Sequence, residues 1–295
     1  MILVTGATGQ VGYHLMEALA DAGADAAAMI RVEAKAADLP GSQQPVVATL
    51  DGPPPSDVLQ AFDQVFLLSP AHEGQVELEL TFIDALVAAG HQPHVVKLAA
   101  DGFLDPGCEV RFMRNHRQIA EHLDRTALPV TYLASSLHME NLLEAADTIR
   151  DQATIFAPAG DGKIGFVAAS DVAKVAARVL SSPLHEDTVY VLTGPEALSY
   201  GGVAARVSAV FARQVDYQEM PEHTAREQML ASGLSPWQAE GSLELFDWIR
   251  EGGADSVTST VREVTGNDPH SLADWLGEMR GAFLGRPPGL APEFV

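Results

Sequence analysis

The stretch MILVTGATGQVG, from Met1 to Gly12, decides the fold of this chain. It joins an apolar run, Ile2–Thr5, to a helix expected over Val11–Ala22. The turn between them carries Gly6, Gly9 and Gly12. Small residues allow a tight turn, a close approach of the backbone to a pyrophosphate, and a helix whose free N–H groups face that anion. The stretch therefore predicts a dinucleotide site; the alternative is a strand-to-helix turn without a ligand.

Length and composition limit the number of domains and the kinds of binding partner that this chain can have. The chain has 295 residues, of which 47% are hydrophobic, so it can form a full doubly wound domain and a smaller one. Its 40 acidic residues against 18 basic ones give a net charge of -22, spread along the chain. This charge disfavours nonspecific binding to nucleic acid or to an anionic membrane.

Cysteine use and hydropathy point to the cytoplasm. Cys108 is the single cysteine, so an intramolecular disulfide and a thiolate metal site are both excluded. The first strand begins at Ile2, which leaves no room for a signal segment, and no apolar run is long enough to span a bilayer. No set of His, Asp and Glu has metal-ligand spacing, so we expect no metal.

Beyond the turn, short β-branched runs alternate with alanine- and leucine-rich helical stretches, which is typical of βαβ units around a parallel sheet. Strands are expected at Ile2–Thr5, Ala26–Ile30, Pro45–Ala48, Val65–Leu68, Val95–Leu98, Val130–Leu133 and Thr188–Leu192. Helices are expected at Val11–Ala22, Ser56–Ala61, Gln75–Ala89, Arg114–Arg125, after Asp171, and at Gly201–Ala212, His223–Ser232, Gln238–Glu251 and Ser271–Phe283. The fold class predicted is α/β, a Rossmann-like doubly wound parallel sheet with a smaller, mostly helical C-terminal lobe. We expect residues 1–195 to form the NAD(P)-binding domain, with about 138–170 crossing to the substrate side, and residues 196–295 to form the lobe.

The end of the second strand indicates which dinucleotide is bound. Arg31 follows Ile30 directly, and Lys35 lies close behind. Two cations there can neutralise a 2′-phosphate, so NADP is favoured. NAD stays open because Glu33 could bind the ribose hydroxyl instead, and both cations could simply be solvated surface charges.

Four motifs in order resemble one family. They are TGATGQVG at 5–12, HMENLL at 138–143, PAGDGKI at 158–164 and SDVAKVAARVL at 170–180. Together with Arg31 and Lys35 they resemble the NmrA-like group of atypical short-chain dehydrogenases, especially its bacterial NAD(P)H:quinone oxidoreductases. The resemblance covers roughly residues 1–195.

The resemblance implies the following roles by motif position. The pyrophosphate would contact Gly6, Thr8, Gly9, Gln10 and Val11. The 2′-phosphate end would contact Arg31 and Lys35. Asp51 would flank the adenine, Leu68, Ser69 and Pro70 would pass the nicotinamide ribose, and Leu98 and Ala99 would complete the cofactor site. Met139, Asn141, Gly160 and Lys163 would shape the substrate side, and the nicotinamide would lie over the sheet edge.

The usual catalytic machinery of short-chain dehydrogenases is missing. Their Tyr-x-x-x-Lys pair uses the lysine to lower the pKa of the tyrosine that exchanges a proton with a carbonyl. None of the tyrosines here has a lysine four residues later: Tyr13, Tyr132, Tyr190, Tyr200 and Tyr217. The usual serine after the fifth strand is also replaced, by Ala99 and Ala100, so we do not expect carbonyl reduction by the standard triad.

Three histidines remain as candidates for helping the chemistry. His116 stands where related quinone reductases also have histidine, and an imidazole of ordinary pKa could protonate a quinone oxygen; the alternative is a surface histidine. His138 is expected to face the nicotinamide and an aromatic substrate, or to be structural. His72, in the substrate set, should lie near the ligand crevice, although a solvated loop residue is the favoured interpretation.

These observations favour an NAD(P)H-dependent oxidoreductase acting on a quinone or another planar aromatic small molecule, including polyketide-type compounds. Such an acceptor needs little acid catalysis because the cofactor does the hard chemistry. A variant is oxygenase-type tailoring, in which the reduced substrate reacts with oxygen. The alternative from another class is a non-catalytic NAD(P)-binding sensor of the NmrA type. The sequence leaves the oligomeric state open.

Overall fold

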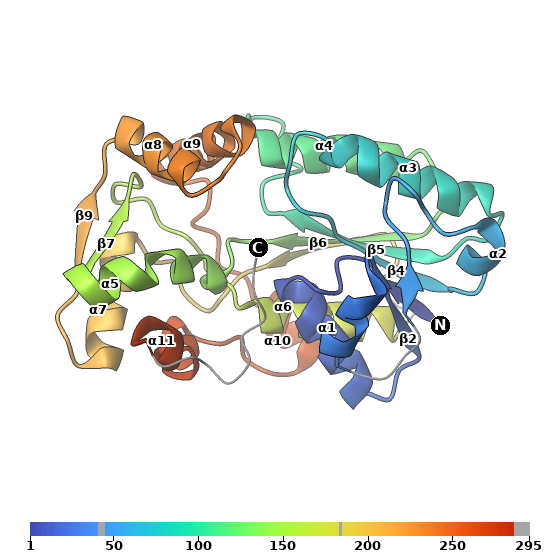
Figure 1. Ribbon diagram of the computed structural model, residues 1–295, viewed down its shortest axis with the longest axis horizontal. Coiled ribbons are helices and arrows are strands. Elements are labelled where there is room, and N and C mark those ends of the chain that lie inside the picture. The colour runs from blue at the N-terminus through green and yellow to red at the C-terminus, as the bar shows by residue number, and fades with distance from the viewer. Residues whose placement is uncertain (41–44, 183–184, 286–295) are drawn as a thin grey trace. The chain divides into compact units, whose positions relative to one another are not determined.

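The chain builds one large sheet at its N-terminal side. The computed structural model describes residues 1–40, 45–182 and 185–285. Seven strands follow the order β3-β2-β1-β4-β5-β6-β8 (Figure 1). Their bounds are β1 Ile2–Val4, β2 Ala26–Ile30, β3 Val46–Val47, β4 Gln64–Leu67, β5 His94–Ala100, β6 Val130–Ser135 and β8 Thr188–Leu192. Strand β1 runs parallel to β2 and to β4, β2 to β3, and β4 to β5. This is the strand order of the doubly wound dinucleotide-binding fold, so the Rossmann-like prediction is confirmed.

The contacts divide the chain into two compact units, and both are discontinuous in sequence. Unit 1 comprises residues 1–105, 112–134 and 169–191, and unit 2 comprises residues 106–111, 135–168 and 192–295. The last ten residues of the predicted lobe lie outside the described residues. Each unit is described by itself below.

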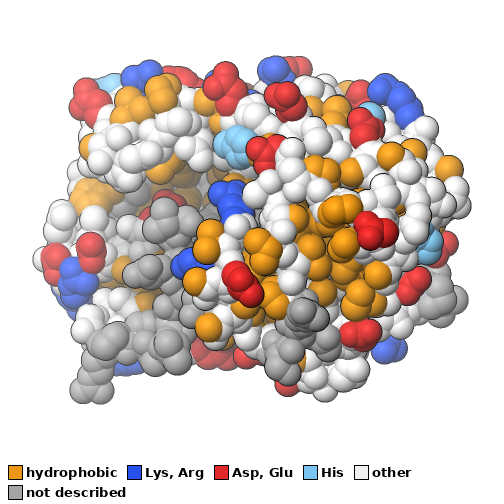
Figure 2. All heavy atoms as spheres, turned by 45° about the vertical axis from the view of Figure 1, so that its right-hand side comes forward, with side chains coloured by type: hydrophobic (Ala, Val, Ile, Leu, Met, Phe, Trp, Pro, Cys, Tyr) orange, Lys and Arg blue, Asp and Glu red, His pale blue; other side chains and the backbone are white. Residues whose placement is uncertain are grey.

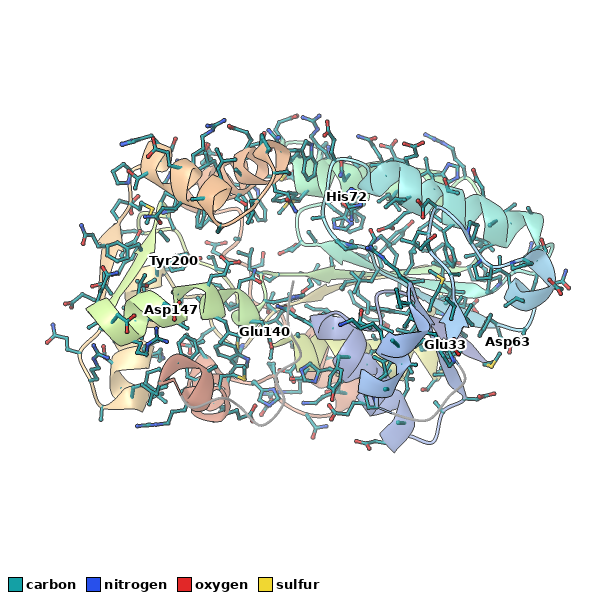
Figure 3. All side chains as sticks on the ribbon, viewed as in Figure 1. Glu33, Asp63, His72, Glu140, Asp147 and Tyr200 are labelled. Carbon is teal, nitrogen blue, oxygen red and sulfur yellow. The ribbon has the colours of Figure 1, made fainter. Side chains whose placement is uncertain are left out.

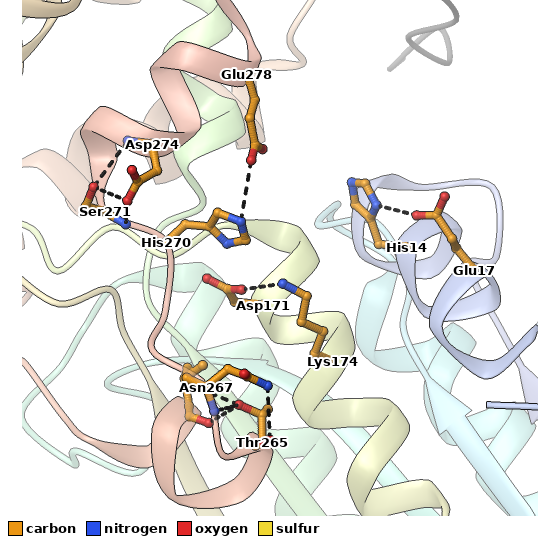
Figure 4. Close-up of polar contacts among 11 residues, drawn as sticks. His14, Glu17, Asp171, Lys174, Thr265, Asn267, His270, Ser271, Asp274 and Glu278 are labelled. Atoms are coloured by element: carbon orange, nitrogen blue, oxygen red, sulfur yellow. Dashed lines mark hydrogen bonds and ion pairs between the residues drawn. The ribbon is translucent and has the colours of Figure 1, made fainter. Parts of the chain in front are cut away.

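In unit 1 helices lie on both faces of the sheet. Figure 1 shows α3 and α4 along one face, and α1 with α6 along the other. The helices are α1 Gln10–Asp21, α2 Ser56–Leu59, α3 Gln75–Ala88, α4 Arg111–Leu123 and α6 Ala169–Leu180, with a 3₁₀ turn, η1, at Glu33–Asp38. The central strands are buried on both faces, which their apolar sequences require. Within α6, Lys174 makes an ion pair with Asp171 at 3.1 Å (Figure 4).

Unit 2 is mostly helical but contains a small sheet of its own. Strands β7 Thr154–Ala157 and β9 Asp216–Glu219 pair in parallel. The helices are η2 Met139–Ala145, α5 Ala146–Gln152, α7 Tyr200–Phe211, α8 Glu222–Ala231, α9 Pro236–Arg250, α10 Thr260–Thr265, α11 Leu272–Glu278 and α12 Arg280–Phe283. A buried apolar cluster that includes Phe166, Phe211 and Trp275 joins η2, α5, α7, α9, α11 and α12. Ser271 and Asp274 form the capping box that begins α11 (Figure 4).

The surface reflects the acidic composition without concentrating it. Figure 2 shows acidic side chains scattered over one face, between apolar and uncharged groups. In the described part of the chain, no helix has the length and apolarity that a membrane span requires. The same residues hold no group of three or more His, Cys, Asp and Glu arranged to bind a metal ion.

Candidate cofactor and active site

The glycine turn has the geometry that a pyrophosphate site needs. Gly6 adopts a φ of +61°, and the N–H of Gly9 donates to the carbonyl of Gly6 at 3.0 Å. Gly9 is the N-cap of α1, and no side chain caps that end. A Cβ on Gly12 would lie 2.1 Å from the carbonyl oxygen of Gly6, so only glycine lets the helix approach the strand this closely. The first turn of α1 therefore offers its N–H groups to an anion.

This turn is fastened to the end of β4, at the point where the strand order reverses. The hydroxyl of Thr5 donates to the carbonyl of Leu68 at 2.9 Å and accepts from its N–H at 2.8 Å. A Cβ on Gly6 would meet the Leu68 side chain at 3.1 Å. Among the predicted pyrophosphate residues, Thr8 is exposed while the side chain of Val11 is in the core, so Val11 can contribute only its backbone. In folds of this class, the switch point between the two central strands is where ligands bind.

The exposed end of β2 carries the residues predicted to select the dinucleotide. Arg31 follows β2 directly, and Lys35 lies in η1; both side chains are exposed. The hydroxyl of Thr49 and the charge of Arg31 help to lower the pKa of Asp51, with the hydrogen bond the larger cause. A role of Arg31 and Asp51 at the adenosine end of the cofactor stays a prediction.

A buried polar network underlies the loop after β4, and the sequence analysis missed it. The hydroxyl of Ser69 donates to Oε1 of Glu79 at 2.6 Å, and Nζ of Lys97 donates to the same oxygen at 3.0 Å. Lys97 also donates to the carbonyl of Leu98 at 2.6 Å. The side chains of Lys97 and Glu79 are 1% and 0% exposed. The hydroxyl of Ser69 is therefore hydrogen-bonded within the protein. Pro70, the next residue of the loop, is exposed. A lysine inside the otherwise apolar strand HVVKLAA was the signal that could have revealed this pair.

His116 is a neighbour of this network. Burial, together with the positive charge of Lys97, holds the pKa of His116 well below its usual value of 6.5. Its Nδ1 is buried and meets no hydrogen-bond partner among the described residues. The structure thus differs from the expectation of an ordinary pKa: the imidazole is neutral near pH 7, so it can donate a hydrogen bond but not act as a cationic acid.

His72 has a local role in the structure. Its Nδ1 accepts a hydrogen bond from the N–H of Gly74 at 3.1 Å, and its carbonyl accepts from the N–H of Gln75 as α3 begins (Figure 3). The side chain of Asn115 also donates to this carbonyl, at 3.4 Å. These contacts fix the turn between β4 and α3. A contact of His72 with substrate stays a prediction.

In unit 2, His138 is held at the end of β6. Its Nε2 lies 2.9 Å from the hydroxyl of Ser135, which also donates to the carbonyl of Ser136. Because a hydroxyl has one proton, this arrangement favours His138 donating from Nε2 to Ser135, which leaves Nδ1 as an acceptor. Burial lowers the pKa of His138 to about 4, so it too is neutral at pH 7.

The other residues predicted on the substrate side belong to the same unit. Met139 is buried, and its N–H donates to Val167 at 2.9 Å, whereas the side chains of Asn141 and Lys163 are exposed. The N–H of Gly160 donates to Oε2 of Glu219 at 2.8 Å. The structure therefore shows Gly160 as part of the support of its loop, while Asn141 and Lys163 present side chains to solvent.

Buried and partly buried aromatic rings, which the sequence analysis did not select, gather in unit 2. Tyr200 stacks on Tyr217 at 6.1 Å and has Phe166 and Phe246 at 6.1 and 6.3 Å. The label in Figure 3 marks Tyr200. Burial and the charge of Glu144 raise the pKa of Tyr200, so its phenol stays protonated.

Tyr132, Leu98 and Ala99 do not replace the missing triad. Tyr132, which lies in β6, donates its hydroxyl to Asp124 at 2.7 Å and is buried, and burial raises its pKa. Leu98 and Ala99 are buried at the end of β5, and neither carries a polar side chain. Of the residues predicted from the sequence, the whole cofactor set, His72 and His116 fall in unit 1, whereas His138, Met139, Asn141, Gly160 and Lys163 fall in unit 2.

Comparison with known proteins identifies the family. The model of the NmrA-like family matches residues 1–267. The chain belongs to the NmrA-like family. The resemblance of the four sequence motifs to this family is thereby confirmed.

Relatives at about 30% identity match almost the whole chain. An NAD(P)H azoreductase of Xenophilus azovorans is 30% identical over 287 residues, which cover 96% of this chain and 99% of the relative. A (4-alkanoyl-5-oxo-2,5-dihydrofuran-3-yl)methyl phosphate reductase of Streptomyces griseus is 31% identical over 96% of this chain and 99% of the relative. Among solved structures, an NADPH-dependent quinone oxidoreductase of Escherichia coli, complexed with NADPH, matches with a TM-score of 0.84. It is 25% identical, and the match covers 95% of this chain and all of that one.

Proposed function

We propose that this NmrA-like protein is an NADPH-dependent reductase of planar, electron-poor small molecules such as quinones. The observation that carries the proposal is the uncapped N-terminus of α1 at the β1–β4 switch point, where Gly12 leaves room for nothing larger than hydrogen. The relatives support it, since their names state reduction by NAD(P)H of azo compounds and of quinones.

NADPH fits the residues that are present. The first turn of α1 would hold the pyrophosphate, and the exposed cations Arg31 and Lys35 would hold the 2′-phosphate. When bound, the cofactor supplies a hydride to the acceptor. Unit 1 would therefore hold the dinucleotide.

The chain's own residues have a limited task in such a reaction. Reduction of a quinone adds one hydride and one proton, and the negative charge that develops on oxygen is spread over a conjugated ring. A neutral imidazole can stabilise that charge by donating a hydrogen bond, and water can then supply the proton. His116 and His138 are both neutral at pH 7, and they are our candidates for this contact.

The decisive experiment follows the absorbance of NADPH with a panel of quinones, azo compounds and conjugated enones. Oxidation of NADPH above the blank is expected with at least one class. Tight NADPH binding with no oxidation across the panel would favour a non-catalytic sensor. Hydroxylated polyketide-type quinones belong in the panel with an oxygen electrode, because oxygen uptake coupled to product oxygenation would identify the tailoring variant.

The histidine assignments have a separate test. His116→Ala and His138→Ala should each lower kcat and leave the Kd for NADPH nearly unchanged, because neither residue is in the predicted pyrophosphate or 2′-phosphate set. His122→Ala is a matched control on the same helix as His116, where the wild-type side chain pairs with Asp84 near the surface. Full activity in both variants would show that the assignments are wrong.

A further inference from the structure

The carboxyl ends of β4 and β5 are joined by a buried ion pair. These strands are neighbours in the sheet, and their register ends with Leu67 opposite Lys97. Nζ of Lys97 lies 3.0 Å from each of the two carboxylate oxygens of Glu79, which comes from α3. The side chains of Lys97 and Glu79 are 1% and 0% exposed. The two charges are therefore enclosed within unit 1, at the edge of the sheet where folds of this class bind ligands.

Each charge holds one of the two strand ends. Oε1 of Glu79 accepts a hydrogen bond from the hydroxyl of Ser69 at 2.6 Å, and Nζ of Lys97 donates to the carbonyl of Leu98 at 2.6 Å. Hydrogen bonds to an ionised group are shorter and stronger than those between neutral groups. The pair thus holds the chain at Ser69 and at Leu98, and both residues belong to the predicted cofactor set.

From Ser69 the contacts continue to the glycine turn. The preceding residue, Leu68, accepts from the hydroxyl of Thr5 at its carbonyl, at 2.9 Å, and donates to that hydroxyl from its N–H, at 2.8 Å. A Cβ on Gly6 would lie 3.1 Å from the carbonyl oxygen of Leu68. Because the turn packs this closely on Leu68, a shift of Ser69 moves the residue that supports the turn.

Glu79 also receives the hydrogen bonds of the rest of the β4–α3 connection. The side chain of Gln75 donates to Oε1 of Glu79 at 3.5 Å. The side chain of Asn115, from α4, donates to that of Gln75 and to the carbonyl of His72, both at 3.4 Å. These longer bonds are weaker than the bond from Ser69. The carboxylate of Glu79 is therefore the point on which the polar contacts of this connection converge.

Stability is a poor explanation for an ion pair in this position. Removing two charges from water costs several kcal/mol per ion, and apolar residues of similar volume often stabilise a core as well or better. An apolar pair would fill the same space but could not accept from Ser69 or donate to Leu98. What the ion pair adds to unit 1 is a fixed position for these two residues.

We propose that Glu79 and Lys97 are positioning residues for the cofactor: they fix Ser69 and Leu98, and through Leu68 the glycine turn, in the arrangement that binds the pyrophosphate and the nicotinamide of NADPH. The proposal deepens the proposed function, and it rests on the predicted cofactor contacts of these residues. It does not depend on the reduction of any acceptor.

Two double variants separate this role from a general support of unit 1. Lys97→Met/Glu79→Leu removes both charges together, so that neither is left buried and unpaired, and it takes the acceptor away from Ser69. Lys97→Met/Glu79→Gln removes the same charges but keeps a side-chain oxygen that can accept from Ser69. The matched control, Lys174→Met/Asp171→Asn, removes another ion pair of unit 1, in which the carboxylate is 2% exposed and the atoms are 3.1 Å apart.

Amide hydrogen exchange in the free, full-length protein tests whether the pair fixes the strand end. The N–H of Leu68 should exchange at least about tenfold faster in Lys97→Met/Glu79→Leu than in the wild type, because its bond to Thr5 loses support. Its exchange in Lys97→Met/Glu79→Gln and in the control should stay close to that of the wild type. Equal acceleration at Val96, in the middle of β5, would mark the pair as a general support and overturn the proposal.

Ser69→Ala keeps the ion pair whole and is the second test if a double variant does not fold. It removes only the hydroxyl that joins the chain after β4 to Glu79. The exchange of the Leu68 amide should again be faster than in the wild type, and unchanged exchange would overturn the proposal.

Binding of NADPH and of adenosine 2′-phosphate tests the consequence for the cofactor. NADPH should bind at least about tenfold more weakly to Lys97→Met/Glu79→Leu than to the wild type, and Lys97→Met/Glu79→Gln should recover most of this loss. Adenosine 2′-phosphate lacks the pyrophosphate and the nicotinamide, so its Kd should be the same in all three proteins. Unchanged binding of NADPH, equal losses for both ligands, or no recovery with glutamine would each overturn the proposal. If no acceptor is reduced by any of the proteins, the proposed function fails, while amide exchange and NADPH binding still test the role of the pair.

Discussion

Replacing Gly12 by alanine is the sharpest perturbation that the cofactor turn offers. Alanine is the better helix former by about 1 kcal/mol, so in an open helix the change would stabilise the protein. Here its Cβ would lie 2.1 Å from the carbonyl oxygen of Gly6, 2.7 Å from the carbonyl carbon and 2.8 Å from the Cα of Ala7. All three atoms are backbone, so α1 must move away from β1.

Overpacking of this kind costs about 1–3 kcal/mol, and the backbone contacts place Gly12→Ala at the upper end. After the gain in helix propensity, a net loss of about 2 kcal/mol remains, which corresponds to roughly 4–8 °C in Tm for a domain of this size. NADPH should bind at least about tenfold more weakly, because a shift of the helix end removes contacts worth 1.4 kcal/mol or more.

Thermal unfolding followed by circular dichroism, and titration with NADPH, measure both effects. Gly277→Ala is the matched control, since Gly277 also lies in a helix, α11, and a Cβ there would meet nothing within 4 Å. That variant should be as stable as the wild type or slightly more stable, and it should bind NADPH normally. If Gly12→Ala behaves like Gly277→Ala, the close packing of α1 on β1 is not what forms the site.

Three further outcomes are expected. Arg31→Ala should weaken the binding of NADPH by about tenfold or more and that of NADH little, because the guanidinium would pair with the 2′-phosphate. Equal losses of affinity for both dinucleotides would refute the preference for NADPH. Burial lowers the pKa of His138 from 6.5 to about 4, so below pH 6.5 the unfolded chain binds a proton that the folded chain does not. The free energy of unfolding should then fall by up to about 3 kcal/mol as the pH is lowered from 6.5 to 4. In urea unfolding, this free energy should depend less on pH in His138→Gln than in the wild type. Equal slopes against pH in the two proteins would speak against a buried imidazole. Trp275→Phe removes a 3.2 Å hydrogen bond to the buried Glu140 and should lower the free energy of unfolding by about 1–3 kcal/mol, whereas an unchanged Tm would show that this bond contributes nothing.

The elements that sequence could predict are those whose signal is local. The strands Ala26–Ile30 and Thr188–Leu192 have the predicted bounds, and α1 is displaced by one residue from its predicted range. In each case a continuous apolar run or a helical spacing lies between turn residues, and burial in the sheet requires that pattern. The predicted helix Ser271–Phe283 is interrupted at Met279, where α11 ends and α12 begins.

The strands that were missed depend on partners far away in the chain. Strand β9 reads DYQE, which carries no apolar alternation, and it is a strand because β7 supplies its hydrogen bonds from a distant part of unit 2. Helix α5 was missed as well; its C-cap is Ala153, which adopts a φ of +53°. Neither β9 nor α5 has a local sequence pattern of a strand or a helix, and the composition of both segments is typical of a loop.

The glycine turn and the surroundings of His116 differ in the same way. The glycine turn could be predicted because one short segment contains the strand end, the turn and the helix start. The chemistry around His116 could not, because the expected role depended on its pKa, which burial and the charge of Lys97 lower only once the chain is folded. A charged residue in the middle of a buried parallel strand is the clue that such sequences offer.

The rate of acceptor reduction with NADPH deuterated at C4 of the nicotinamide tests the central claim most directly. Hydride transfer from a cofactor held at the Gly6–Gly12 turn predicts slower single-turnover oxidation of the deuterated cofactor than of the ordinary one, with a quinone that the panel has shown to be reduced. The same slowing should persist in Lys174→Met/Asp171→Asn, which leaves the site intact. Binding of NADPH without any acceptor-dependent oxidation, or oxidation with no isotope effect in a single turnover, would contradict it.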